Sequence, residues 1–377
     1  MGASALRKSG TPNRPRVTFA IGGLGIGGSE RQLIDLISEA HPERIEAAVI
    51  TFSSACDPAH GERLRELGVE LIQLSPSHGP RALRPALSVP RTFSALQRLQ
   101  PDLIYSWLEE ASTTVTPPAR ALGVPVVIAR RSVCGSKTER WAIFRLPIRW
   151  AERRASLVTG NSRAVIEVAE ERGVRADRLR LVRNGHPPVE PLPPPPGEVV
   201  ALGYLANYRA EKGHSRLLAA LELVRAESPW RADLVGAGPL QKQIAAEIAD
   251  RGLSERVWAG GPVTDIRGFW AEHDVAVLLS DDEGSPNALI EAALLGRPLV
   301  GTDGGGTREI VAPDGGLLVS HEPREIAAAL ERLIDDQALR LALGKGARLQ
   351  AAERHDLQRF VAGHLSVIEE ALQAGLV

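Results

Sequence analysis

Two glutamates, Glu283 and Glu291, lie eight residues apart in the segment EGSPNALIE, at the expected start of a helix. The apolar run at 275–279 that precedes them is typical of a buried strand. Ser285 suits the N-cap of the helix and Pro286 its first position, so we expect free N–H groups to point out of a sheet there. Such a helix start attracts phosphate, whereas carboxylates suit hydroxyl groups on either side of it. A phosphate flanked by two polyhydroxylated groups describes a nucleotide-sugar.

Two cations, Arg209 and Lys212, lie in the segment GYLANYRAEKGH, just before a helix that Gly213 begins. Cations in a loop at the carboxyl end of a strand are well placed to neutralise a diphosphate. The alternative is a solvated turn. We favour the diphosphate because the two glutamates follow in the same half of the chain.

A glycine-rich loop, GGLGIGGSERQL, follows the first apolar run of the chain. Gly23, Gly25 and Gly28 match the dinucleotide fingerprint, which alone is a weak signal. An NAD site also needs an acid at the end of the second strand, and no acid follows that strand before Asp57. A tight turn is a second alternative. We prefer a phosphate or sugar approached closely by the backbone, because glycine has no Cβ to block it.

Clustered carboxylates at Asp281, Asp282 and Glu283 raise the alternative of a metal site, since hard cations bind such groups. No second acidic or histidine cluster is spaced to complete the coordination. We therefore expect the two aspartates to cap or solvate the turn, and we predict no metal.

Arginines are interleaved with aromatic and aliphatic residues from Arg130 to Arg154. One interpretation is an amphipathic helix packed on a sheet. The other is a patch that contacts an anionic membrane surface or an anionic acceptor. The sequence leaves both open.

Composition limits the classes of protein to consider. A chain of 377 residues suits two domains, and a net charge of −1 gives no electrostatic case for nucleic acid. Two cysteines, Cys56 and Cys134, form no disulfide framework and suit a reducing cytoplasm. We expect residues 1–14 to be a disordered tail and not a secretory signal, because they lack an apolar stretch.

Apolar runs and helical patterns alternate along the chain, stop at the segment PPVEPLPPPP, and then start again. Strand–helix alternation predicts parallel sheets, and a proline-rich segment cannot form helix or sheet interior. We therefore predict an α/β protein with two doubly wound Rossmann-like domains that face each other across a cleft. The expected parts are a tail at 1–14, an acceptor domain at 15–188, a linker at 189–197, a donor domain at 198–354 and a terminal helix at 355–377.

The combined motifs resemble retaining glycosyltransferases of family 4, which have the GT-B fold. Glu283 and Glu291 match the E-x7-E motif of that family. The glycine loop and the loop of Arg209 and Lys212 also look like family segments, as do LVGAGPL, NGHPP and GGGTREIV. The resemblance covers nearly all of the chain from Arg16.

This resemblance implies a UDP- or GDP-linked sugar donor, retention of anomeric configuration and no metal or other cofactor. It makes Glu283, Arg209 and Lys212 the catalytic residues: Arg209 and Lys212 stabilise the leaving diphosphate, and Glu283 contacts the donor sugar. It places Glu291 on the ribose. The leaving phosphate itself would take the acceptor proton. It implies that the terminal helix packs back on the first domain. The remaining donor-binding residues would be Gly284, Ser285, Pro286 and Asn287, with Gly25, Gly27 and Gly28 from the first domain.

The acceptor side departs from the family pattern. Many relatives carry a histidine after the fourth strand, where this chain has Tyr105 and Trp107. We predict that these two residues, with Arg130 and Arg131, shape a site for a glycan or lipid-linked acceptor. The expected location is cytoplasmic, with contact at the inner membrane face as an option. A nucleotide-sugar epimerase and a non-catalytic partner subunit are the competing hypotheses.

Overall fold

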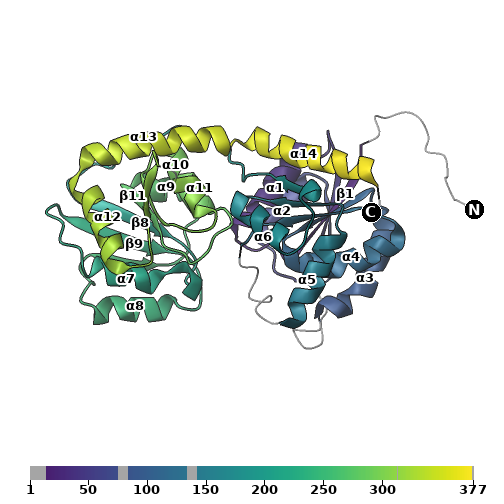
Figure 1. Cartoon of the computed structure of the whole chain (residues 1–377), viewed down its shortest axis with the longest axis horizontal. Helices are drawn as coiled ribbons and strands as arrows, with labels where there is room; N and C mark the ends of the chain where they lie inside the picture. The colour runs from purple at the N-terminus through teal and green to yellow at the C-terminus, as the bar shows by residue number, and fades with distance from the viewer. Residues whose placement is uncertain (1–13, 75–83, 134–141, 312, 376–377) are drawn as a thin grey trace, which may run out of the picture. The chain divides into compact units, whose positions relative to one another are not determined.

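The computed structural model describes residues 14–74, 84–133, 142–311 and 313–375 (Figure 1). These residues group into two compact units. The first consists of Met1–Ala129, Trp150–Leu157 and Leu365–Val377, and the second of Arg130–Arg149 and Val158–His364. Two parallel sheets with surrounding helices make up the fold, so the predicted α/β class with doubly wound sheets is confirmed.

The first sheet has seven strands in the order β3-β2-β1-β4-β5-β6-β7. The chain order reverses between β1 and β4, which pair in parallel with Ile21 opposite Trp107. The loops that follow these two strands therefore lie side by side. The strands are β1 Arg16–Ile21, β2 Glu46–Thr51, β3 Glu70–Gln73, β4 Leu103–Trp107, β5 Val126–Arg130, β6 Leu157–Gly160 and β7 Leu179–Leu181. The helices between them are α1 Gly28–Ala40, α2 Pro58–Glu66, α3 Arg84–Leu99, α4 Glu109–Leu122, α5 Ala142–Arg154 and α6 Arg163–Glu171.

The second sheet has six strands in the order β10-β9-β8-β11-β12-β13. Here the order reverses between β8 and β11, which pair with Val275 opposite Leu202. The strands are β8 Val200–Leu205, β9 Trp230–Val235, β10 Val257–Gly260, β11 Val275–Leu278, β12 Leu299–Thr302 and β13 Gly316–Val319. The helices that follow β8 along the chain are α7 His214–Leu221, α8 Gln241–Asp250, α9 Ile266–Ala271, α10 Asn287–Leu294, α11 Thr307–Val311, α12 Pro323–Asp335, α13 Gln337–Arg354 and α14 Leu357–Ala374.

Helices cover both faces of the second sheet, with α7 and α8 on one side and α10 and α13 on the other (Figure 1). All four residues of β11 and all four of β12 are buried as a result. This two-sided burial accounts for the continuous apolar runs in the sequence. The buried strands end where the polar loops after β8 and β11 begin.

The boundaries of the predicted domains stay predictions. Residues 187–199, at the expected linker, contain neither helix nor strand, and α14 lies within the expected terminal helix. Residues 1–13 of the expected tail and residues 134–141 of the basic segment lie outside the described residues.

Candidate functional site

The candidate site lies at the switch point of the second sheet, where the loops after β8 and β11 meet. The first loop contains Arg209 and Lys212, and the second contains Glu283. Residues far apart in sequence come together because β8 and β11 are neighbouring parallel strands. The adjacency that the sequence predicted for these two motifs therefore follows from the strand order.

Gly213 holds the two loops against each other. Its φ is +66°, in the left-handed region, and a Cβ on it would lie 2.1 Å from the carbonyl oxygen of Leu279. Both observations require glycine at this position. Asp281 N–H donates to the carbonyl of Glu211 at 2.8 Å, which joins the loops a second time.

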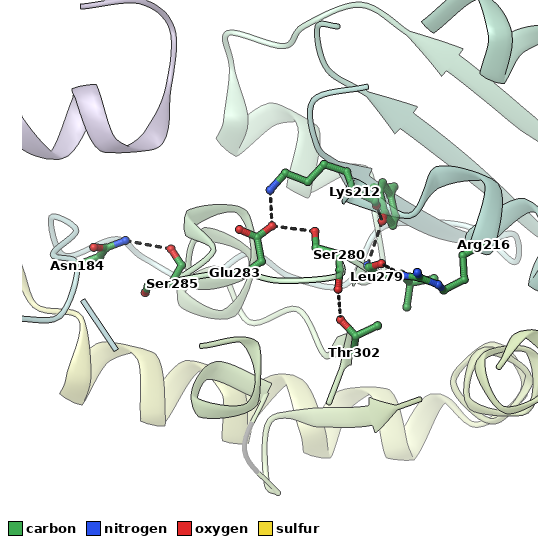
Figure 2. A network of polar contacts seen from close by, with 9 residues as sticks. Asn184, Lys212, Arg216, Leu279, Ser280, Glu283, Ser285 and Thr302 are labelled. Atoms are coloured by element: carbon green, nitrogen blue, oxygen red, sulfur yellow. Dashed lines mark hydrogen bonds and ion pairs between the residues drawn. The ribbon is translucent and has the colours of Figure 1, made fainter. Parts of the chain in front are cut away.

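Lys212 and Glu283 form an ion pair between Nζ and Oε1 (Figure 2). Their side chains are 24% and 14% exposed, so the pair is mostly shielded from solvent. Ser280 Oγ donates to the same carboxylate oxygen at 2.7 Å. The second oxygen, Oε2, has no partner in the described part of the chain. Glu283 thus has one occupied oxygen and one that can accept a hydrogen bond from a ligand.

Side-chain hydroxyl groups form hydrogen bonds with the backbone around this ion pair. Thr302 Oγ1 donates to the carbonyl of Ser280 at 2.6 Å (Figure 2). The Tyr204 hydroxyl donates to the Lys212 carbonyl and accepts from Leu279 N–H at 3.0 Å. Burial raises the pKa of Tyr204, so its phenol remains a donor at neutral pH. Sequence reasoning missed Ser280, Tyr204 and Thr302, because only the tertiary fold brings their polar groups under the two loops.

Arg209 differs from Lys212 in its surroundings. It is exposed at the start of a short 3₁₀ turn, Ala210–Lys212. Its guanidinium forms no ion pair or side-chain hydrogen bond with any residue that the structure describes. The loop therefore presents one paired and one unpaired cation, and both are available to an anionic ligand, because an ammonium has three N–H groups.

The helix start after Glu283 differs from the expectation. α10 begins at Asn287, its N-cap is Pro286 in extended conformation, and no side chain caps it. The prediction that Ser285 is the N-cap was therefore wrong. The extended backbone of Pro286 moves the helix start beyond the reach of the Ser285 hydroxyl. Glu291, in the second turn of α10, is half-buried.

Gly284 has a packing role that the sequence did not indicate. A Cβ on it would lie 2.2 Å from the carbonyl oxygen of Arg131. Glycine is therefore required by a neighbouring backbone, whether or not a ligand approaches. The Ser285 carbonyl accepts a hydrogen bond from Asn184 Nδ2 at 3.1 Å (Figure 2).

The glycine loop of the first unit connects β1 to α1. A Cβ on Gly25 would stand in open space, whereas one on Gly27 would lie 2.2 Å from Oε2 of Glu30. Gly27 is the N-cap of α1 and Gly28 is its first residue. The Glu30 carboxylate therefore lies close to the helix start at which the sequence predicted a phosphate or sugar. A hydroxyl group suits this environment better than a phosphate, because like charges repel.

The residues predicted for the acceptor side are buried. Tyr105 and Trp107 have no exposed surface; Tyr105 stacks on Phe19 at 5.7 Å, and Trp107 Nε1 donates to the Ser29 carbonyl at 2.9 Å. In this conformation they can shape a site only from beneath the glycine loop.

The two arginines at the end of β5 are buried as well. Arg130 is 1% exposed and donates to the Val133 carbonyl at 3.3 Å. Arg131 is 7% exposed, and its Nη2 donates to Asn184 Oδ1 at 2.5 Å. This contact directs Arg131 toward the loop of Glu283 and Ser285, a role that the sequence did not predict.

The aspartates of the DDE cluster do not converge. Asp281 pairs with Arg216 at 2.5 Å. Within the described ranges, no group of three or more His, Cys, Asp or Glu side chains is arranged to hold a metal ion. Searched over the same residues, none of the helices is both long and apolar enough to cross a membrane.

Comparison with known families and proteins gives consistent matches. Residues 26–189 match the family model described as Glycosyltransferase Family 4, and residues 198–336 match Glycosyl transferases group 1. The lipopolysaccharide core biosynthesis glycosyltransferase LpsD of Rhizobium meliloti is 24% identical, over 85% of this chain and 88% of its own. The MMP α-(1→4)-mannosyltransferase of Mycolicibacterium hassiacum is 31% identical over 43% of this chain, which spans only 40% of that enzyme. The crystal structure of Anabaena Alr3699/HepE with UDP and glucose has a TM-score of 0.80 and 22% identity, and it covers 94% of this chain and 100% of its own.

Proposed function

The chain belongs to glycosyltransferase family 4 and has the GT-B fold, and from that premise we propose that it moves a sugar from a nucleoside diphosphate sugar to a glycan or lipid-linked acceptor, with retention of configuration. We place this reaction in the synthesis of a cell-surface polysaccharide or glycoconjugate. One observation carries the proposal: the Lys212–Glu283 pair lies at the switch point beside an unpaired cation, Arg209. Cations for a diphosphate and a carboxylate for a sugar hydroxyl are thereby held together.

In the proposed mechanism the donor binds without breaking the ion pair. Lys212 donates one N–H to Glu283 and keeps two for the diphosphate. Arg209 donates to the diphosphate from the N–H groups of its guanidinium. Oε2 of Glu283 accepts from a hydroxyl of the donor sugar. Glu291 accepts from the ribose hydroxyls, so the sugar and the nucleoside are each held by one glutamate.

The chemical step needs no side chain as base. The bond between the anomeric carbon and the phosphate oxygen breaks, and a bond from the acceptor oxygen to the same face of that carbon forms. The acceptor proton passes to the departing phosphate oxygen. Arg209 and Lys212 stabilise the charge that develops on the diphosphate, in the manner of preorganised donors. The step uses no metal ion.

Two relatives support the substrate classes. The HepE structures contain UDP, and one of them contains UDP-glucose, which supports a nucleotide-sugar donor. LpsD is named for lipopolysaccharide core biosynthesis, which supports a lipid-linked glycan as acceptor.

The first experiment is a thermal-shift panel with UDP, GDP, ADP and NAD, followed by turnover assays with the matching sugar nucleotides. A ligand at about 100 times its Kd adds roughly 2.7 kcal/mol of stability. We expect UDP or GDP to stabilise the protein, and Glu291→Ala to abolish sugar transfer without unfolding it. Lys242→Ala, an exposed lysine of α8, is the control and should transfer normally.

Three outcomes would overturn the proposal. Stabilisation by NAD alone would point to a dehydrogenase-type cofactor. An epimerised sugar in the absence of any acceptor would point to an epimerase. Unchanged turnover in Glu291→Ala would show that the site lies elsewhere.

We also propose that α5 contacts an anionic membrane surface. Leu146 and Trp150, one turn apart, are 71% and 41% exposed, and Arg153 and Arg154 are exposed beside them. The guanidinium of Arg154 lies 6.0 Å from the Trp150 ring centroid. An exposed apolar pair bordered by cations suits the headgroup region of an anionic bilayer.

Vesicle sedimentation at low salt tests this contact. The protein should sediment with phosphatidylglycerol vesicles and not with phosphatidylcholine vesicles, and Trp150→Ala combined with Arg153→Glu should abolish binding. Trp258, which is 59% exposed on β10, supplies the control variant Trp258→Ala, with binding retained. A wild-type protein that ignores phosphatidylglycerol would overturn the contact.

A further inference from the structure

The NGHPP motif has no role in the function proposed above, yet its asparagine lies under the Glu283 loop. Asn184 is 3% exposed, and its side-chain amide donates twice: to the Ser285 carbonyl at 3.1 Å and to Asn287 Oδ1 at 2.7 Å. Its Oδ1 accepts from Arg131 Nη2 at 2.5 Å. A guanidinium can only donate, so the contact with Arg131 fixes which end of the Asn184 amide is oxygen.

The orientation of Asn287 follows from that of Asn184. Asn287 Oδ1 accepts from Asn184, and His186 Nε2 lies 3.3 Å from the same oxygen. Because this oxygen is an acceptor, His186 must donate from Nε2. The amide nitrogen of Asn287 then has no partner in the described part of the chain, and the residue is half-buried at the first position of α10.

The segment that carries Asn184 and His186 is itself rigidly held. His186 N–H donates to the His355 carbonyl at 2.8 Å, and Leu357 N–H donates to the His186 carbonyl at 3.0 Å. His355 Nδ1 contacts the Asn184 carbonyl at 2.9 Å. A Cβ on Gly185 would lie 2.3 Å from Cβ of Phe360, so only glycine allows this approach. The motif is therefore a fixed support.

We infer that Arg131, Asn184 and His186 form a relay that turns the two amide N–H groups of Asn287 toward the diphosphate of the donor. The inference rests on the proposed function and extends it. Asn287 is the contact residue, and Asn184 and His186 are positioning residues that act through it. Anionic oxygens suit this place because Asn287 is the first residue of α10 and the start of a helix attracts negative charge.

Replacement of Asn184 by aspartate tests its role as a hydrogen-bond donor without changing the size of the side chain. Asn184→Asp keeps the shape but removes both N–H donors, and its carboxylate faces Asn287 Oδ1. The Asn287 amide then turns over so that its N–H groups bond to the new carboxylate and face away from the diphosphate. Loss of a hydrogen bond to a charged group weakens binding by about tenfold or more.

A double-mutant cycle measured with UDP and GDP by calorimetry is the test. Asn184→Asp and Asn287→Ala should each raise the Kd of the nucleotide that binds by about tenfold. The double variant should match Asn287→Ala and not show about a hundredfold loss, because both changes remove one contact. His186→Leu should weaken binding, whereas His186→Gln, which still offers an N–H, should restore it.

A stability control excludes general unfolding. Asp336 caps α13 by accepting from Leu339 N–H at 2.8 Å and touches nothing in the relay. Asp336→Ala should lower the Tm and leave the Kd unchanged.

The outcomes separate the two proposals. If Asn184→Asp weakens nucleotide binding as much in the Asn287→Ala background as in the wild type, Asn184 does not act through Asn287 and the relay is refuted. If Glu291→Ala weakens binding while every relay variant binds normally, only the relay is refuted. If the wild-type protein binds neither UDP nor GDP, the proposed function itself fails.

Discussion

Replacing Lys212 by methionine removes the ammonium and keeps the aliphatic stem. In the wild type, Oε1 of Glu283 accepts from Lys212 Nζ and from Ser280 Oγ. The variant leaves the carboxylate with the serine hydroxyl alone. We expect Lys212→Met to lower both the stability of the fold and the rate of sugar transfer.

The size of the stability loss follows from the shielding of the pair. The two side chains are 24% and 14% exposed, so their attraction is only partly screened. A hydrogen bond to a charged group contributes about 1.5–3 kcal/mol, and partial exposure reduces this to about 1–2 kcal/mol. In a unit of this size, each kcal/mol shifts Tm by about 2–4 °C, so we expect a shift of about 2–8 °C.

Two further variants distinguish the roles of charge. Lys212→Met combined with Glu283→Gln removes both charges, so the Tm should recover while sugar transfer stays low. Arg209→Met removes the exposed, unpaired cation of the same loop, so transfer should fall with no change in Tm. Differential scanning calorimetry and a radiolabelled donor assay measure both quantities. A Lys212→Met protein with wild-type Tm would refute the ion pair, and one with wild-type transfer would refute its role in donor binding.

Two other substitutions test the site's framework and its pH dependence. Gly213→Ala should destabilise the fold more than Gly252→Ala. Both positions have positive φ, +66° and +68°, but only the Cβ at Gly213 meets a backbone atom, Leu279 O. Equal losses of stability in urea denaturation would contradict this prediction. His214 is buried, which lowers its pKa from 6.5 to about 4, so the folded state excludes a proton that the unfolded state binds and stability falls as pH drops from 6.5 to 4. His214→Phe should reduce this slope by up to about 1.4 kcal/mol per pH unit, and an unchanged slope would show that His214 does not cause it.

The sequence was sufficient to predict that the loops at the switch point of each sheet lie close together. Strand–helix alternation predicts doubly wound sheets, and such sheets place the loops around the switch point together. Arg209, Lys212 and Glu283 could therefore be assigned to one site before any coordinates. The direct contact between Lys212 and Glu283 could not, because it depends on side-chain conformations set by Ser280 and by the close approach at Gly213.

The start of α10 shows the limit of local rules. Ser285 before a proline is a good N-cap by composition. In the fold its carbonyl accepts from Asn184, which is 101 residues away in sequence. A rule that considers only neighbouring residues cannot take such a distant partner into account. The helix starts later than predicted.

Tyr105 and Trp107 are predicted for the acceptor side because they stand where many relatives carry a histidine after the fourth strand. That reasoning overlooked two-sided burial: β4 is a central strand, and all five of its residues are buried. In a parallel sheet covered on both faces, strand side chains form the core, and ligands contact the loops beyond them. The sequence also did not indicate that the side chain of Arg130 would be buried.

The geometry of Glu283 favours a binding role over a catalytic one. A general base needs a carboxylate oxygen that reaches the acceptor hydroxyl and can take its proton. Both donors to Glu283, Lys212 and Ser280, converge on Oε1, which leaves a single oxygen for a ligand. In the proposed mechanism that oxygen accepts from a hydroxyl of the donor sugar, which places it on the donor and not on the acceptor. The proposed transfer of the acceptor proton to the phosphate agrees with this role, because Arg209 and Lys212 carry charges opposite to that of the diphosphate.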